Sequence, residues 1–211
     1  MTGSFRAAGV PLGLASLVAA CTGISAGAPA VAADLTRTEV VCTAQAEEDY
    51  SPAITSSVHD SAITGTIKLL SCTESLIDVD TGATISATSH TGTLADPVAL
   101  GTFDNVVLKD GTCTSLPVSP PSISGQVDFT WYDPTGGTGV LQINNPLTST
   151  VDGDIVFAAT HDDFTATSTR YPGFHIVAAG LGDPIHEGSC APGQSGVTKV
   201  TGAIQFTFTS P

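Results

Sequence analysis

The chain has 211 residues, which is enough for one domain with a hydrophobic core and does not require two. Its 20 acidic residues outnumber its 6 lysines and arginines, which gives a formal net charge of −14 at pH 7. A surface of this charge repels phosphate groups, so nucleic acids and anionic lipid headgroups are excluded as favourable partners.

The N-terminus has the pattern of an export signal. Arg6 precedes an apolar stretch over residues 7–20, which is shorter than the roughly 20 residues of a membrane-spanning helix. Ala30-Val31-Ala32 fits the small-x-small rule of signal peptidase. We therefore expect residues 1–33 to be a signal peptide and residues 34–211 to be the secreted domain, with no transmembrane segment.

A second processing route is open at the same end. Val18-Ala19-Ala20-Cys21 is similar to the lipobox of bacterial lipoproteins, in which the cysteine becomes the lipidated first residue. The signal peptidase route is favoured, because small apolar residues with an occasional cysteine occur by chance in signal sequences. A secreted location is expected, and a membrane-anchored lipoprotein attached through Cys21 is the alternative.

The remaining cysteines predict a covalent framework. An even number of cysteines in an exported chain indicates disulfides, here two, because the oxidising compartment leaves few thiols free. Their spacing is too wide for a zinc ribbon or a redox CxxC motif. The four residues are Cys42, Cys72, Cys113 and Cys190.

Three pairings of these cysteines are possible, and a weak geometric argument favours one of them. If residues 38–45 and 64–72 form neighbouring antiparallel strands, Cys42 lies opposite Cys72. Cys113 then pairs with Cys190 by elimination.

Strand signals recur along the chain in order, with almost no helical period. Apolar and polar residues alternate, so one face of each strand is expected in the core and the other in water. The expected inward residues are Ile63, Ile67 and Leu69; Ala83, Ile85 and Ala87; Val127, Phe129 and Trp131; and Val200, Ile204, Phe206 and Phe208.

Turn residues separate these strands. Asp152-Gly153 is a hairpin signal between expected strands at 147–151 and 154–160, because glycine tolerates the positive φ of a tight turn. Short strands separated by such turns, without βαβ alternation, are typical of an all-β fold. We predict a single antiparallel β-sandwich or barrel domain.

Two acidic segments are candidate cation sites. His161-Asp162-Asp163 lies near Asp152 and Asp154 in sequence, but a strand over 154–160 would hold the two turns more than about 20 Å apart. Asp78-Val79-Asp80-Thr81-Gly82 resembles the start of a calcium loop but lacks its distal Glu. Polar turns are the favoured interpretation, and we expect no metal site and no cofactor.

A catalytic serine is also disfavoured. Ser195, in Gly193-Gln194-Ser195-Gly196, lacks the second spacing and the following helix of a nucleophile elbow. His161, His175 or His186 would be its candidate bases, since catalytic triads assemble in space and not in sequence. We expect no catalytic residues, and a loop-based hydrolase remains an alternative.

Exposed aromatic residues suggest a second alternative, a carbohydrate-binding module. Trp131 is expected inside, whereas Tyr132 and Tyr171 are better placed to be exposed and to face a ligand.

Several motifs together resemble a known group. They are Cys42 followed by Tyr50-Ser51-Pro52, the segments GTIKLLSC, GTCTS and DFTWYD, and the closing GAIQFTF strand. The chain in this respect resembles the small, secreted, Thr/Gly-rich β-proteins encoded in multiple copies by actinobacteria. That group has no established activity, so the resemblance implies no catalytic or binding residues.

The favoured interpretation is therefore a non-enzymatic, disulfide-stabilised β-domain, exported to the extracellular or cell-envelope space. It is expected to be a monomer that binds an unidentified extracellular or cell-surface ligand or has a structural role there.

Overall fold

The computed structural model describes residues 35–112, 122–146, 149–151, 154–156, 162–191 and 193–211. Within these ranges the chain forms β-strands and no α-helix, as the alternation of apolar and polar residues predicts. The strands are β1 (Thr36–Ile54), β2 (His59–Asp78), β3 (Thr84–Thr91), β4 (Ala99–Gly111), β5 (Ser122–Trp131), β6 (Thr138–Pro146), β7 (Ser149–Val151), β8 (Asp154–Val156), β9 (Asp162–Phe164), β10 (His175–Gly180), β11 (Ile185–Ser189) and β12 (Gly196–Thr209).

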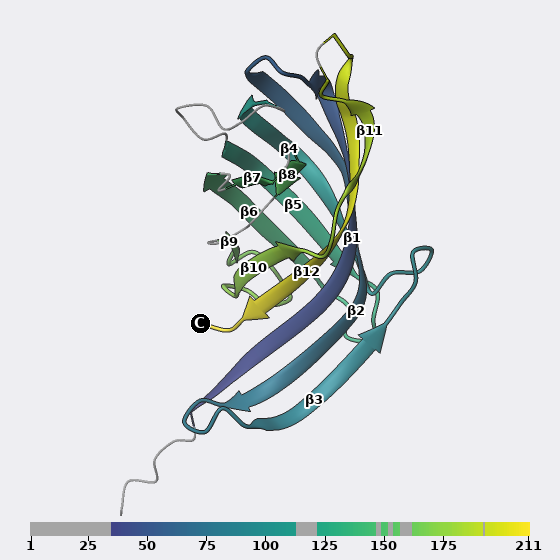
Figure 1. Cartoon of the computed structure of the whole chain (residues 1–211). Coiled ribbons are helices and arrows are strands. Elements are labelled where there is room, and N and C mark those ends of the chain that lie inside the picture. The colour runs from purple at the N-terminus through teal and green to yellow at the C-terminus, as the bar shows by residue number, and fades with distance from the viewer. Residues whose placement is uncertain (1–34, 113–121, 147–148, 152–153, 157–161, 192) are drawn as a thin grey trace, which may run out of the picture. The chain divides into compact units, whose positions relative to one another are not determined.

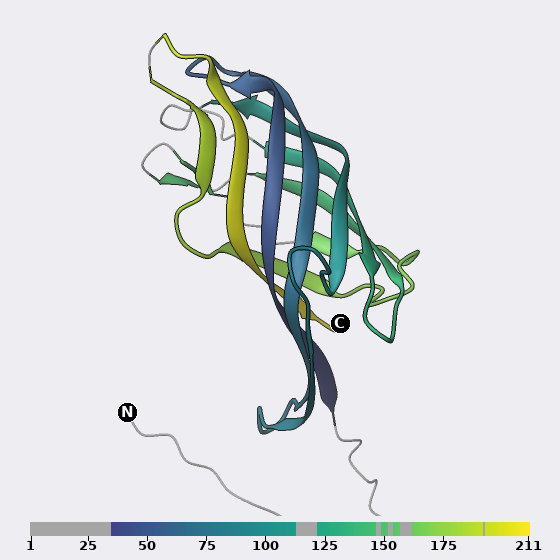
Figure 2. The same ribbon diagram turned by 90° about the vertical axis from the view of Figure 1, so that its right-hand side faces the viewer.

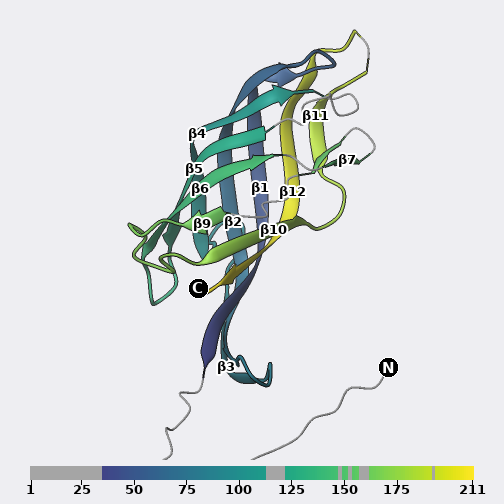
Figure 3. The same ribbon diagram turned by 90° about the vertical axis from the view of Figure 1, so that its left-hand side faces the viewer.

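Ten of the strands form one antiparallel sheet that curls into a half-barrel (Figure 1). The order is β1-β12-β10-β9-β6-β5-β4-β2-β3, β11 lies beside β12, and β1 also pairs with β2. β12, β1 and β2 lie side by side on the outer surface (Figure 2), and the curl is seen from its other side in Figure 3. The prediction of an antiparallel all-β fold is confirmed. A single curled sheet is observed in place of the two packed sheets of a sandwich, because strands as long as β1 and β2 accumulate twist along their length.

Strand β2 changes neighbours along its length. Up to Leu69 it pairs with β4, whereas residues 71–77 pair with β3. β3 and β4 therefore diverge, and we call this point the fork. Beyond the fork, β1, β2 and β3 continue as a three-stranded ribbon outside the half-barrel (Figure 1).

Inward side chains form two hydrophobic clusters. The larger contains the predicted core residues Val127, Phe129 and Trp131, each at most 4% exposed, together with the buried Phe206 and Phe208 of β12. The smaller, which we call the hairpin-end cluster, lies next to the turn between β1 and β2. Its buried members are Tyr50, Ile54, Ile63, Val106, Leu108, Ile123 and Val197.

The favoured disulfide between Cys42 and Cys72 is confirmed. The two residues face each other on β1 and β2, and both are buried in the larger cluster. The register therefore places the two sulfur atoms on the same inward side of neighbouring strands. The second predicted pairing involves Cys113, which lies outside the described residues.

The predicted inward face of residues 83–90 is wrong. The strand itself is present as β3, but its residues are exposed except for the partly buried His90, and Ile85 is 55% exposed. In the described part of the chain β3 pairs with β2 alone. Because it lies in the ribbon and not in the half-barrel, no core covers its apolar side chains.

The strands expected on either side of Asp152-Gly153 are present and pair with each other, while these two residues lie outside the described part of the chain. β7 and β8 pair with Val151 opposite Asp154, on the two sides of residues 152–153. Residues 157–161, expected to continue the second strand, lie outside the described part of the chain.

Candidate binding site at the fork of strand β2

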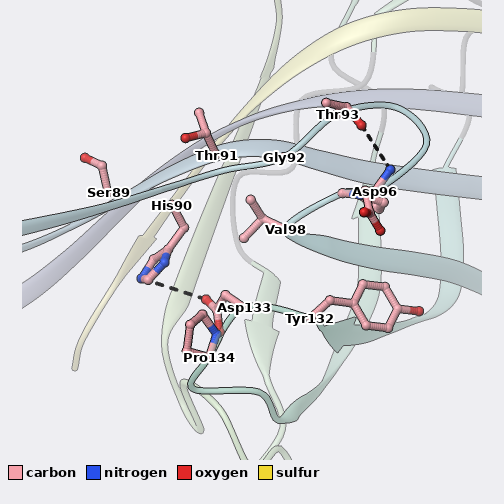
Figure 4. A pocket seen from close by; sticks show the side chains of 11 residues that line it. Ser89, His90, Thr91, Gly92, Thr93, Asp96, Val98, Tyr132, Asp133 and Pro134 are labelled. Carbon is pink, nitrogen blue, oxygen red and sulfur yellow. Dashed lines mark hydrogen bonds and ion pairs between the residues drawn. The ribbon is translucent and has the colours of Figure 1, made fainter.

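A cavity of about 680 Å³ lies at the fork (Figure 4). One wall consists of residues 89–93 at the end of β3 and residues 96–98 after it, and the other is the turn at residues 132–134 after β5. Its volume lies within the range of small-molecule sites. We call this cavity the fork pocket.

Backbone hydrogen bonds hold the loop between β3 and β4 in place. The amide of Gly92 donates to the Leu70 carbonyl at 2.7 Å, and that of Val98 donates to the Leu69 carbonyl at 2.8 Å. A Cβ atom on Gly92 would lie 2.5 Å from the Asp96 carbonyl oxygen, so only glycine lets the two arms of this loop approach so closely. The wall of the pocket is therefore determined by the local sequence.

Asp133 is the buried acid of the fork pocket, with 3% of its side chain exposed. Its Oδ1 accepts hydrogen bonds from the Arg170 guanidinium at 2.5 Å and from the amides of Thr135 and Gly136, both at 3.1 Å. Its Oδ2 is buried and has no hydrogen-bond partner. The ring of His90 approaches Oδ2, with Nε2 at 4.0 Å, beyond hydrogen-bond distance (Figure 4).

Asp133 is held in its ionised form. Burial acts to raise the pKa of its carboxyl group, but the hydrogen bond and charge of Arg170 and the Gly136 amide outweigh burial. The pKa of Asp133 therefore lies below its ordinary value. A carboxylate with one unsatisfied oxygen attracts a hydrogen-bond donor.

Arg170 is fixed by aromatic rings as well as by Asp133. Its guanidinium lies 5.4 Å from the centre of the Trp131 ring and 4.9 Å from that of Tyr171, both within range of a cation–π contact. It also donates to the Tyr171 hydroxyl, which in turn donates to Glu74 Oε2 at 2.7 Å. This chain of contacts links the pocket to strand β2.

The two tyrosines proposed as ligand-facing occupy different environments. Tyr132 lines the fork pocket and is 58% exposed, so its ring is available for stacking. Tyr171 is partly buried against the core and packs on Phe174 and Phe208, with ring centres 5.0 and 6.2 Å away. Its side chain contacts Arg170, which binds Asp133, and does not offer a second exposed ring for stacking.

The described residues of the acidic segments that are candidate cation sites do not line this pocket. The Asp78 carboxylate accepts the Thr81 amide at 2.8 Å in the exposed turn between β2 and β3. Of the other segment, Asp152 and His161 lie outside the described residues, while Asp154 begins β8 and Asp162 begins β9. Among the described residues, no group of three His, Cys, Asp or Glu side chains is arranged to hold a metal ion.

The candidate catalytic serine is not joined by His175. Ser195 is an exposed residue just before β12, whereas His175 pairs with Thr209 at the opposite end of that strand, roughly 45 Å along it. His186 lies on the exposed strand β11 opposite Val200. His161 lies outside the described residues.

Sequence reasoning missed His90, Asp133 and Arg170 as parts of one site. No motif in the sequence singles out His90 or Asp133 as a binding residue. Local sequence patterns do not predict that these three residues lie close together, because their proximity depends on the register of β2, β3 and β5. The one hint of a binding site in the sequence is a charged residue beside an aromatic residue, as in Trp131-Tyr132-Asp133 and Arg170-Tyr171.

Comparison with known proteins leaves the fold and the site without a relative: no family model, no curated protein and no solved structure matches this chain. In the part of the chain that the structure describes, no helix has the length and apolarity needed to cross a membrane.

Proposed function

We propose that this protein is an exported, non-enzymatic binding domain that takes a neutral carbohydrate in the fork pocket. The export pattern of residues 1–33 supports a location outside the cytoplasm, and so does the Cys42–Cys72 disulfide, because such bonds persist in oxidising compartments. We also propose that the resemblance to the secreted Thr/Gly-rich β-proteins of actinobacteria reflects a relationship to that group. Release into the medium is favoured, with lipid anchoring through Cys21 as the alternative.

The exposed ring of Tyr132 and the exposed acid Asp96, which line the same pocket, carry the proposal. Sugars present an apolar ring face that stacks on aromatic side chains, and hydroxyl groups that donate hydrogen bonds to carboxylates. The hydroxyls of Thr91 and Thr93 add further polar groups to the same pocket, and the buried Asp133 adds a negative charge to its wall. The excess of acidic residues disfavours an anionic ligand.

Titration calorimetry of the purified domain with cellotetraose and with chitotetraose tests the ligand class. We expect binding to at least one of them, weakened about fivefold in Tyr132→Ala, because stacking on an aromatic ring contributes on the order of 1 kcal/mol. The matched control is Ile185→Ala, which removes another exposed apolar side chain, on β11 and outside the fork pocket. The proposal fails if neither sugar binds at millimolar concentration, or if both variants lose affinity alike.

Mass spectrometry of the intact protein from its native host tests export independently of the ligand. A chain beginning near residue 34 is expected, with a mass that rises by four hydrogen atoms when its two disulfides are reduced. A lipid mass on Cys21 would instead establish the anchored form, and loss of that mass in Cys21→Ser would locate it. A full-length chain retained inside the cell would refute export.

A further inference from the structure

Glu48 is a carboxyl group inside the half-barrel. Inward and outward residues alternate along β1, and Glu48 belongs to the inward set between Ala46 and Tyr50. Only 6% of the residue is exposed. Ala46 belongs to the larger cluster and Tyr50 to the hairpin-end cluster, so the acid lies at the junction of the two.

One described side chain makes a hydrogen bond to this acid. The Tyr50 hydroxyl donates to Glu48 Oε2 at 2.5 Å, and Tyr50 is itself 5% exposed. Burial, together with the neighbouring acid, raises the pKa of the Tyr50 hydroxyl well above its ordinary value, so Tyr50 stays protonated. The pair therefore changes charge only at Glu48.

The adjacent residue Glu47 has the opposite environment. It lies on the outer face of β1, where the ammonium groups of Lys199 and Lys68 approach its carboxylate at 3.6 and 4.0 Å. Because these lysines flank Glu47 from β12 and β2, the basic residues nearest in register are engaged outside the half-barrel. Glu47 is thus the same residue type as Glu48 at the next position, but it is not buried and serves as a control.

The other charged residues on the surrounding strands also lie outside. Asp104 and Lys109 of β4 are exposed, and Asp128 of β5 alternates with the inward Val127 and Phe129. On β11, His186 and Glu187 are exposed, His186 in register with the Val200 that faces Glu48. The causes that act on the pKa of Glu48 are burial and the Tyr50 hydrogen bond, with no charged side chain among them. Burial accordingly raises the pKa of the Glu48 carboxyl to about 7, and the hydrogen bond from Tyr50 lowers it only in part.

The backbone is irregular at the same level. Gly65 lies opposite Glu48 on β2 and has a φ of +139°, and an added Cβ atom would overlap the Glu47 carbonyl oxygen. The β2–β4 register also slips between Ile63 and Thr66. Irregular pairing on the strand next to Glu48 leaves fewer regular backbone hydrogen bonds to hold the two clusters together there.

We propose that Glu48 is a proton-operated switch that controls the packing of the hairpin end of the half-barrel. In the closed state Glu48 is protonated, remains buried against Tyr50, and the hairpin-end cluster is packed. In the open state Glu48 is ionised and draws in water, which separates that cluster from the larger one. The Cys42–Cys72 disulfide and the fork pocket lie in or beside the larger cluster and keep their structure.

The direction of the pH effect follows from the raised pKa. A group that binds its proton more tightly in the folded than in the unfolded state stabilises the fold at low pH, and this stabilisation is lost as pH rises. For Glu48 this stabilisation is lost between about pH 4.5, the ordinary pKa of the carboxyl group, and about pH 7, its pKa in the folded protein. The closed state is therefore the form at acidic pH, and opening is expected above neutrality.

Amide hydrogen exchange of the whole domain at pH 5.5 and 8.5, corrected for intrinsic exchange rates, tests the switch. We expect protection of Ile63 and Val106 in the hairpin-end cluster to fall roughly thirtyfold between the two conditions, as a carboxyl pKa of about 7 implies. Protection of Cys42 and Phe129 in the larger cluster is expected to change much less. An equal loss at both ends would overturn a local switch.

Two variants separate the switch from a general effect of acidic charge. Glu48→Gln retains the shape of the side chain without its titration, so its protection at the hairpin end is expected to be independent of pH. Glu47→Gln removes one negative charge at the next position and is expected to behave like the unmodified protein. The switch is refuted if Glu48→Gln keeps the full pH dependence.

A measurement on the unmodified protein covers the case in which Glu48→Gln does not fold. Carbon-13 chemical shifts of glutamate carboxyl groups are expected to show one acid that titrates near pH 7, in step with the exchange of Ile63. Should every glutamate titrate below pH 5.5, the proposal is wrong whatever the behaviour of the variant.

Discussion

The Arg170 guanidinium lies against the Asp133 carboxylate, with Nη1 2.5 Å from Oδ1, and joins two loops that are 37 residues apart in the chain. Only 8% of the Arg170 side chain and 3% of that of Asp133 are exposed. Arg170 Nη1 also donates to the Gly136 carbonyl at 3.1 Å. The pair therefore fixes the turn that forms one wall of the fork pocket.

Loss of Arg170 is expected to destabilise the domain strongly. In Arg170→Met the Asp133 carboxylate stays buried without its counter-charge, and breaking a buried pair in this way costs about 3–5 kcal/mol. The free energy of unfolding from urea titrations measures the loss. In the double variant Arg170→Met/Asp133→Asn the buried charge is absent, so we expect stability to be partly recovered. A double variant as unstable as the sum of the two single variants would contradict a coupled pair.

Asp133 is expected to make the domain sensitive to strong acid. Because its folded pKa lies below the ordinary value of 3.8, its stabilising contribution is present at higher pH and is lost as pH falls through the folded pKa. The free energy of unfolding should therefore fall with acidification below about pH 4. Asp133→Asn should reduce the slope of this loss, and an unchanged slope would show that other carboxyl groups cause it.

Glu48 and Asp133 thus act in opposite directions along the pH scale. Acidification from pH 7 to about 4.5 protonates Glu48 and stabilises the fold, whereas further acidification removes the contribution of Asp133. Stability is expected to be highest between these two ranges. Denaturant titrations at half-unit steps from pH 3 to 8.5 would show this maximum.

The Cys42–Cys72 disulfide is expected to stabilise the domain by about 3–4 kcal/mol, since it closes a loop over a sequence separation of 30 residues. The double variant Cys42→Ala/Cys72→Ala removes this bond and leaves the other cysteines in place. Its midpoint in guanidinium chloride should fall accordingly. An unchanged midpoint would show that the register of β1 and β2 alone provides the stability of this region.

The sequence predicted well those features that depend on neighbouring residues. The alternation of Val127, Phe129 and Trp131 placed them in the core, and they are buried because a strand sends every second side chain to the same face. The same rule failed for Ile85, since a strand has an inward face only where another layer or the curl of the sheet covers it.

The pairing of Cys42 with Cys72 shows how far local information reaches. Two neighbouring antiparallel strands were sufficient to bring the cysteines opposite each other, and the observed register does so. Pairings across longer distances had no such support. The alternation along β1 could also have predicted that Glu48 is buried, but an acidic residue at an inward position interrupts the apolar pattern on which such a prediction depends.

By itself, the sequence determined an antiparallel all-β chain, its principal core side chains and one disulfide, because each follows from alternation and turns over short distances. Only the tertiary structure decided that β2 exchanges β4 for β3, that this fork leaves a pocket, and that His90, Asp133 and Arg170 meet there. These residues come from three separate segments. Their meeting depends on strand register and on the curl of the whole sheet, which are set by the sum of long-range contacts and not by any one segment.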